Sequence, residues 1–210
     1  MDVSATYTNL PALASDPDGD NISPAREWEL ADPKTGTEPP DFTKLHAEPR
    51  TVVRSFVFFD LCASTALLEE EGPLALVAAV NGFREILRAV CAERGVRVAK
   101  WLGDGAMCVA TKPMNAISTA VDVTYRCGNL KLPARAGVSV SKAVLFDGDD
   151  YIGRGANFAA RICDAAPAGH VLCDPDCLPV PSWVTVLDTT SVELKGMGDH
   201  TVCRLGMASL

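Results

Sequence analysis

The pattern of apolar and polar residues becomes regular only after residue 50. The run TVVRSFVFFD at 51–60 is rich in β-branched and aromatic residues and predicts a strand. Apolar residues at helical spacing occupy 64–95, and Gly72-Pro73 interrupts them. This segment therefore predicts two helices in succession.

The rest of the chain continues this alternation of element types. The runs at 96–102 and 106–111 predict a hairpin joined by Gly-Asp-Gly. Pro113 begins a predicted helix that continues through about Cys127. The run at 134–146 predicts a strand, and 153–166 predicts a helix. Residues 170–207 predict several short strands. The order β-α-β-β-α-β predicts an α+β fold, a ferredoxin-like split βαβ antiparallel sheet with helices on one face.

Residues 1–49 differ in composition from the rest of the chain. Residues 1–50 hold seven of the 14 prolines and ten acidic against four basic residues. We expect an acidic, flexible tail at 1–49 before one domain at 50–210. Asp16, Asp18, Asp20 and Glu27 approach the spacing of a calcium-binding EF-hand loop, but Pro17 interrupts it and the glycine is displaced. A plain acidic segment is therefore favoured.

Charge and hydropathy exclude several classes of partner. The formal net charge of −8 argues against a nucleic acid polymer or an anionic membrane surface. No apolar run approaches the roughly 18 residues that a membrane helix needs, and no secretory signal is visible, so we expect a cytoplasmic protein. Eight cysteines without a CxxC pair are typical of reduced, buried thiols. Zinc held by His170, Cys173 and Cys177 lacks a fourth nearby ligand.

Two aspartates stand at the ends of strands that neighbour each other in a split βαβ sheet. Asp60 ends the strand at 51–60, and Asp104 lies at the tip of the hairpin between Gly103 and Gly105. Paired carboxylates suit Mg²⁺ or Mn²⁺, and two such ions are a common device of phosphoryl chemistry. We expect the glycines to supply positive φ angles and to leave room for a bulky anion. The alternative is two ordinary turn aspartates.

Two further groups of residues suit phosphate and ribose oxygens. Ser64 or Thr65 is expected to cap the helix after Asp60, which places free backbone N–H groups beside that carboxylate as a phosphate cradle. Asn157 and Arg161 are four residues apart and share one helix face, where an amide and a guanidinium can hold sugar and phosphate oxygens. Plain capping and a surface helix with an incidental arginine are the respective alternatives.

Four segments in order resemble the catalytic domain of class III nucleotidyl cyclases, and the single-domain cyclases of actinobacteria most. They are FFDLCASTALL, VAKWLGDGAM, DYIGRGANFAARI and VELKGMGD, within about residues 50–207. The resemblance implies that 50–210 is a cyclase catalytic domain that makes cyclic AMP and pyrophosphate from ATP. It implies that Asp60, Asp104 and the Leu61 carbonyl bind two divalent ions, Mg²⁺ or Mn²⁺. It also implies that Lys100 and Asp150 read the base. Asn157 and Arg161 would act on the ribose and the α-phosphate, and Lys195 would contact the terminal phosphates.

Some positions depart from the family pattern. Ala63 stands where the family usually has glycine, and Arg154 and Ala156 replace small and β-branched residues. Neither departure removes a ligand, although alanine allows the cradle less backbone freedom. For Lys195, a solvated lysine at the end of a strand is the alternative.

The base-reading pair favours ATP. A lysine donor and an aspartate acceptor complement adenine N1 and its N6 amine, whereas guanine presents the reverse pattern. The resemblance also implies a head-to-tail homodimer with shared active sites. The alternatives are a non-catalytic nucleotide-binding homologue, a guanylate cyclase and a diguanylate cyclase, the last disfavoured because LGDGAM lacks a second acid.

Overall fold

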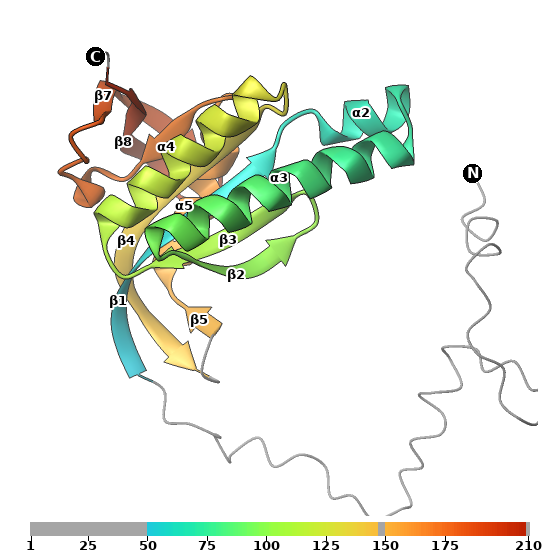
Figure 1. Cartoon of the computed structure of the whole chain (residues 1–210). Helices are drawn as coiled ribbons and strands as arrows, with labels where there is room; N and C mark the ends of the chain where they lie inside the picture. Colours follow the sequence, from blue (N-terminus) through green and yellow to red (C-terminus); the bar gives the residue numbers. More distant parts are fainter. Residues whose placement is uncertain (1–49, 147–149, 209–210) are drawn as a thin grey trace, which may run out of the picture. The chain divides into compact units, whose positions relative to one another are not determined.

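A single, mostly antiparallel sheet carries the fold (Figure 1). The computed structural model describes residues 50–146 and 150–208, so the expected tail at 1–49 and its EF-hand-like stretch lie outside the described residues. The strands are β1 (Arg50–Leu61), β2 (Arg97–Leu102), β3 (Gly105–Ala110), β4 (Ala134–Phe146), β5 (Asp150–Ile152), β6 (Val171–Cys173), β7 (Val184–Leu194) and β8 (Gly198–Met207). Their order is β2-β3-β1-β4-β6-β8-β7, with β5 paired to β4, and only β4 and β6 run parallel among these pairs.

The helices begin and end close to the predicted positions. They are α2 (Ser64–Glu70), α3 (Pro73–Arg94), α4 (Pro113–Asn129) and α5 (Arg154–Ala165), with a 3₁₀ turn, η2 (Pro175–Cys177). The break at Gly72-Pro73 and the start at Pro113 are confirmed. The prediction of short strands near the C-terminus is wrong for β7 and β8, which have 11 and 10 residues and form a long hairpin. The three-residue strand β5 was not predicted.

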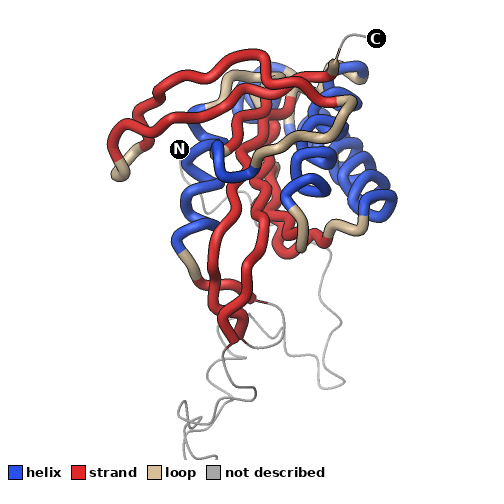
Figure 2. The backbone as a smooth tube through the Cα atoms, turned by 90° about the vertical axis from the view of Figure 1, so that its left-hand side faces the viewer, coloured by secondary structure: helices blue, strands red, loops and turns tan. Residues whose placement is uncertain are grey.

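Helices cover both faces of the sheet, so the expectation of helices on one face is wrong (Figure 2). Val57 and Phe59 of β1 pack in one buried cluster with residues of α3 and α4, whereas Phe56 packs in another with Ala156 and Ala159 of α5. The physical reason lies in the run FVFF: a strand whose successive side chains are all apolar needs cover on both faces. Side chains of Phe56, Phe58 and Asp60 therefore share the α5 face.

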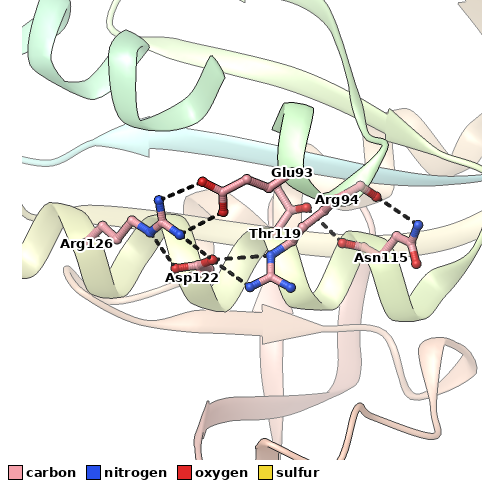
Figure 3. Close-up of polar contacts among 6 residues, drawn as sticks. All are labelled: Glu93, Arg94, Asn115, Thr119, Asp122 and Arg126. Carbon is pink, nitrogen blue, oxygen red and sulfur yellow. Dashed lines mark hydrogen bonds and ion pairs between the residues drawn. The ribbon is translucent and has the colours of Figure 1, made fainter. Parts of the chain in front are cut away.

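An ion-pair network ties α3 to α4 (Figure 3). Asp122 accepts from Arg94 Nη2 at 2.6 Å and from Arg126 Nε at 2.8 Å, and Arg126 also pairs with Glu93 at 2.9 Å. The Asn115 amide donates to the Arg94 carbonyl at 2.9 Å. These contacts fix the two helices that form one wall of the main core.

Two further expectations concern thiols and membranes. All eight cysteines are free, seven are buried and Cys62 is half-buried. Within residues 50–146 and 150–208, no group of three or more His, Cys, Asp or Glu side chains is placed to hold a metal ion, so zinc at His170, Cys173 and Cys177 finds no support. No helix in this part of the chain has the length and apolarity needed to cross a membrane.

Candidate active site

Asp60 lies at the end of β1, where an arginine from the next strand holds its carboxylate. In the register of the sheet Asp60 pairs with Gly105 of β3 on one side and Arg135 of β4 on the other. Arg135 donates to Asp60 Oδ2 from Nη2 at 2.7 Å and from Nε at 2.9 Å. Its Nη1 donates to the carbonyl of Asp164, near the end of α5, at 2.8 Å. Arg135 thus links the carboxylate to the carboxyl end of a helix, where a cation is favourable.

Asp104 lies in the two-residue turn between β2 and β3. Gly103 has a φ of +68°, as predicted. Gly105 has another reason to be glycine: a Cβ there would lie 2.5 Å from the carbonyl oxygen of Phe59. The expectation that both glycines supply positive φ is therefore wrong for Gly105, whose small size lets β3 approach β1. The Leu61 N–H donates to the Asp104 carbonyl at 3.3 Å, which holds the turn against the end of β1.

The two aspartates are neighbours through their backbones, and each of these residues lines a hollow at the surface. Asp60 lines a hollow of about 440 Å³ together with residues 61–65 and Arg135. Asp104 lines another, of about 480 Å³, whose other wall is α3. Oxygen donors from Asp60, Asp104 and the Leu61 carbonyl suit Mg²⁺ or Mn²⁺, which proteins often hold through one or two carboxylates plus substrate phosphates. The donor set therefore fits the ions that the resemblance implies.

The loop after Asp60 leads directly into the first turn of α2. Ala63 is the N-cap residue, with a left-handed φ of 61°, and no side chain caps the helix. The expectation that Ser64 or Thr65 caps the helix is wrong, because α2 already begins at Ser64. Both residues nevertheless line the hollow beside Asp60. Their backbone N–H groups lie in the first turn of the helix, where such groups have no intrahelical partner.

Lys100 and Asp150 meet across the sheet although 50 positions separate them. Lys100 Nζ lies 2.7 Å from Asp150 Oδ1, and the Tyr151 amide donates to the same oxygen at 2.8 Å. Tyr151 packs edge-on against Phe56, and Tyr151 and Ala99 of β2 pack against the same buried cluster, which brings β5 over to β2. The hydrogen bond from Lys100 holds the pKa of the Asp150 carboxyl below its ordinary value. The predicted base-reading pair is thus together in one chain.

The remaining predicted residues stand apart from these groups. Asn157 is exposed on α5, and Arg161 pairs with Asp164 at 3.1 Å. Lys195 is exposed in the turn between β7 and β8. Within the part of the chain that the structure describes, no hydrogen bond or ion pair joins Asn157, Arg161 or Lys195 to Asp60, Asp104, Lys100 or Asp150.

Arg135 was missed in the sequence. It stands in ARAGVSV, a strand pattern in which a single arginine carries no motif. The available signal was the opposite charge of two residues on neighbouring strands: if Asp60 and Arg135 are paired across two antiparallel strands, their charges face each other. Using that signal requires the register, which the sequence alone does not supply.

Solved structures of nucleotide cyclases share this fold. The adenylyl cyclase CyaB from P. aeruginosa superposes with a TM-score of 0.66 at 20% identity, covering 78% of this chain and 97% of that one. The guanylate cyclase domain of RhGC from Catenaria anguillulae, solved with GTP, gives 0.63 at 17% identity, covering 76% and 100%. The chain thus has the fold of class III adenylyl and guanylyl cyclase catalytic domains, and the resemblance seen in its motifs is confirmed at that level.

A comparison of sequences finds relatives that match only part of this chain. An uncharacterized protein of Mycobacterium tuberculosis is 32% identical over 129 residues, which cover 60% of this chain and 34% of that protein. The chain therefore spans about a third of the length of the curated relatives it matches. No family model matches the chain.

Proposed function

We propose that this chain is an adenylate cyclase that converts ATP to 3′,5′-cyclic AMP and pyrophosphate. The observation that carries the choice of ATP is the Lys100–Asp150 pair, with Nζ and Oδ1 2.7 Å apart. An ammonium can donate to adenine N1 and a carboxylate can accept from the N6 amine. Guanine would place a donor against Lys100 and an acceptor against Asp150, at a cost of about 1–3 kcal/mol for each unpaired polar group.

The hollow at the end of β1 supports a site for the phosphates. The amides of Ser64 and Thr65 offer hydrogen-bond donors, and the Arg135 guanidinium adds positive charge. Asp60, Asp104 and the Leu61 carbonyl would hold two divalent ions. When bound, such ions lower the pKa of the attacking hydroxyl and neutralise charge on the phosphates.

The remaining residues supply orientation and charge in the proposed reaction. The ribose 3′-hydroxyl loses its proton to water, its oxygen forms a bond to the α-phosphorus, and the bond from that phosphorus to the oxygen shared with the β-phosphate breaks, so that pyrophosphate leaves. Asn157 holds the ribose in line, Arg161 neutralises charge on the α-phosphate oxygens, and Lys195 holds the terminal phosphates. Before it can do so, Arg161 has to leave Asp164, which is exposed and therefore a weak competitor.

We propose that these last residues act on the site of a second copy of the chain. Lys195, Asn157 and Arg161 are exposed or half-exposed and stand apart from the Asp60 hollow of their own chain. A head-to-tail homodimer would bring each set to the partner's aspartates and produce two identical sites. The resemblance to class III cyclases implies the same arrangement, in which the base-reading pair Lys100 and Asp150 comes from the same chain as Asn157 and Arg161 and the metal aspartates come from the other chain.

The test is product identification from the purified chain. We would incubate the protein with Mn²⁺ and either ATP or GTP and identify the product by mass spectrometry. We expect cyclic AMP from ATP and much less cyclic GMP. Asp60→Asn keeps the size of the side chain but removes its charge and should abolish turnover, whereas Glu85→Gln, at an exposed glutamate of α3, should not. Nucleotide binding without any cyclic product would indicate a non-catalytic homologue, and cyclic GMP as the main product would contradict the choice of ATP.

A further inference from the structure

The turn that carries Asp104 is held from two sides. On one side the Leu61 N–H donates to the Asp104 carbonyl at 3.3 Å. On the other, Nη2 of Arg84, in the middle of α3, donates to the Gly103 carbonyl at 2.9 Å. Adjacent peptide carbonyls of the turn are thus tied to different elements, β1 and α3.

Arg84 is itself fixed by its surroundings. Its guanidinium lies over the ring of Trp101 at 4.9 Å from the centroid, and Arg88, one helical turn later, lies over the same ring at 5.0 Å. Stacking on an indole orients a planar guanidinium, which reduces the freedom lost when it makes a directed hydrogen bond. Arg84 Nε is buried and has no hydrogen-bond partner among residues 50–146 and 150–208, so the bond from Nη2 is a principal polar anchor of this group.

The turn next to this anchor, Gly103 and Asp104, lines the hollow along α3. That hollow is lined by Leu76, Val77, Val80, Asn81, Arg84 and the turn. Gly103 has a φ of +68°, and glycine lets the turn adopt more than one arrangement at low cost. Without an anchor on the α3 side, the bond from Leu61 would leave the Gly103 peptide free to rotate.

We propose that Arg84 is a positioning residue for the metal-binding turn: its bond to the Gly103 carbonyl fixes the direction in which Asp104 presents its carboxylate. The inference rests on the proposed cyclase function, since it matters for turnover only if Asp104 binds metal. Arg84 touches neither substrate nor metal in this scheme. Its effect is on how well the Asp104 carboxylate is oriented before the ions arrive.

The test compares Arg84→Met with Arg88→Met. Both remove one guanidinium from Trp101 and keep an apolar stem, but only the first removes the bond to Gly103. We would measure hydrogen exchange of the peptide covering residues 97–110 in the protein alone, Mn²⁺ binding by electron paramagnetic resonance with a non-reactive ATP analogue, and kcat and KM for ATP. Circular dichroism and thermal unfolding would establish that each variant is folded.

For Arg84→Met we expect turn amides that exchange at least about tenfold faster, several-fold weaker Mn²⁺ binding and a roughly tenfold lower kcat, with KM for ATP within about twofold. Arg84→Lys should recover part of each loss, because an ammonium can still donate to the carbonyl. Arg88→Met should stay within about twofold of the unmodified chain. Equal effects in the two methionine variants, or unchanged exchange and Mn²⁺ binding in Arg84→Met, would overturn the proposal. If the unmodified chain forms no cyclic nucleotide, the proposed function fails, while exchange and Mn²⁺ binding still test Arg84.

Discussion

Both Nε and Nη2 of Arg135 donate to one oxygen of Asp60, at 2.9 and 2.7 Å, so that oxygen already has a strong partner before any metal arrives. A divalent ion would compete for it or take the other oxygen. The pair lies where β1 ends and β4 begins, with 27% of the Arg135 side chain and 34% of the Asp60 side chain exposed. Arg135 therefore combines two tasks: it aligns the carboxylate of Asp60, which we propose as a metal ligand, and it ties β1 and β4 to the end of α5.

We predict that Arg135→Met lowers the free energy of unfolding by about 1–3 kcal/mol, because hydrogen bonds to charged groups are lost and a partly buried carboxylate keeps no counter-charge. Urea titration would measure the change. Arg204→Met is a matched control, since Arg204 pairs with Asp188 in a more exposed setting and its loss should lower the free energy of unfolding less than the loss of Arg135. Equal losses in the two variants would show that Arg135 has no special structural role.

We predict that Ala63→Gly stabilises the chain by about 0.5–1 kcal/mol, because a left-handed φ costs alanine about 1–2 kcal/mol and glycine little. Lys131, with a φ of 56°, offers a matched site away from the proposed active site. Lys131→Gly should raise stability by a similar amount. Only Ala63→Gly should also change KM for ATP, because Ala63 lines the hollow beside Asp60. A stability loss in Ala63→Gly would contradict the strain argument.

We predict that Lys100→Glu lowers kcat/KM for ATP at least about tenfold more than kcat/KM for GTP, since a carboxylate accepts from guanine N1 and repels adenine N1. A full switch should also need a change at Asp150, which still faces guanine O6. The variant places two carboxylates together, so the pKa of Asp150, now held low by Lys100, should rise. Lys112→Glu, just beyond the end of β3, is the control for charge alone. An unchanged ratio of kcat/KM for ATP to kcat/KM for GTP would show that Lys100 does not read the base.

The sequence predicted those parts of the fold that depend on local pattern. The break at Gly72-Pro73, the helix start at Pro113 and the hairpin around Asp104 each result from residues with strong backbone preferences. The strand β5 has only three residues, too few for a periodic pattern, and its place depends on Tyr151 packing on Phe56. An element whose position is set by tertiary contacts, as for β5, leaves little pattern in its own sequence from which it could be predicted.

Candidate site residues were found through side-chain chemistry, whereas their arrangement needed the sheet register. The resemblance to cyclases paired Lys100 with Asp150, and their contact at 2.7 Å depends on a long-range packing of β5 across β1. Gly105 was explained by the wrong cause, because the close approach of the Phe59 carbonyl is visible only in three dimensions. Arg84 donates to a backbone carbonyl and Arg135 to a side chain on the neighbouring strand, and no sequence motif marks such contacts.

The last prediction concerns how two chains would complete one site. Asp60→Ala should remove a metal ligand, and Arg161→Ala should remove the positive charge that the partner is proposed to supply to the α-phosphate, so each variant alone should be inactive. In a mixed dimer both lesions fall in one site and the other site is intact. Random exchange makes about half of the dimers mixed, with one working site of two, so about a quarter of the activity of the unmodified chain should return.

A second mixture provides the control for this experiment. Asp60→Ala mixed with Asp104→Ala places one metal-side lesion in each site of every dimer, so no activity should return. Cyclic AMP formation would be measured after exchange, and native mass spectrometry would establish that mixed dimers are present. If mixed dimers of Asp60→Ala and Arg161→Ala form and remain inactive, each chain does not share its site with the other. Recovery in the control mixture as well would mean that the Asp60 and Asp104 of one site come from different chains, and this would contradict the proposal that one chain supplies both aspartates to a site.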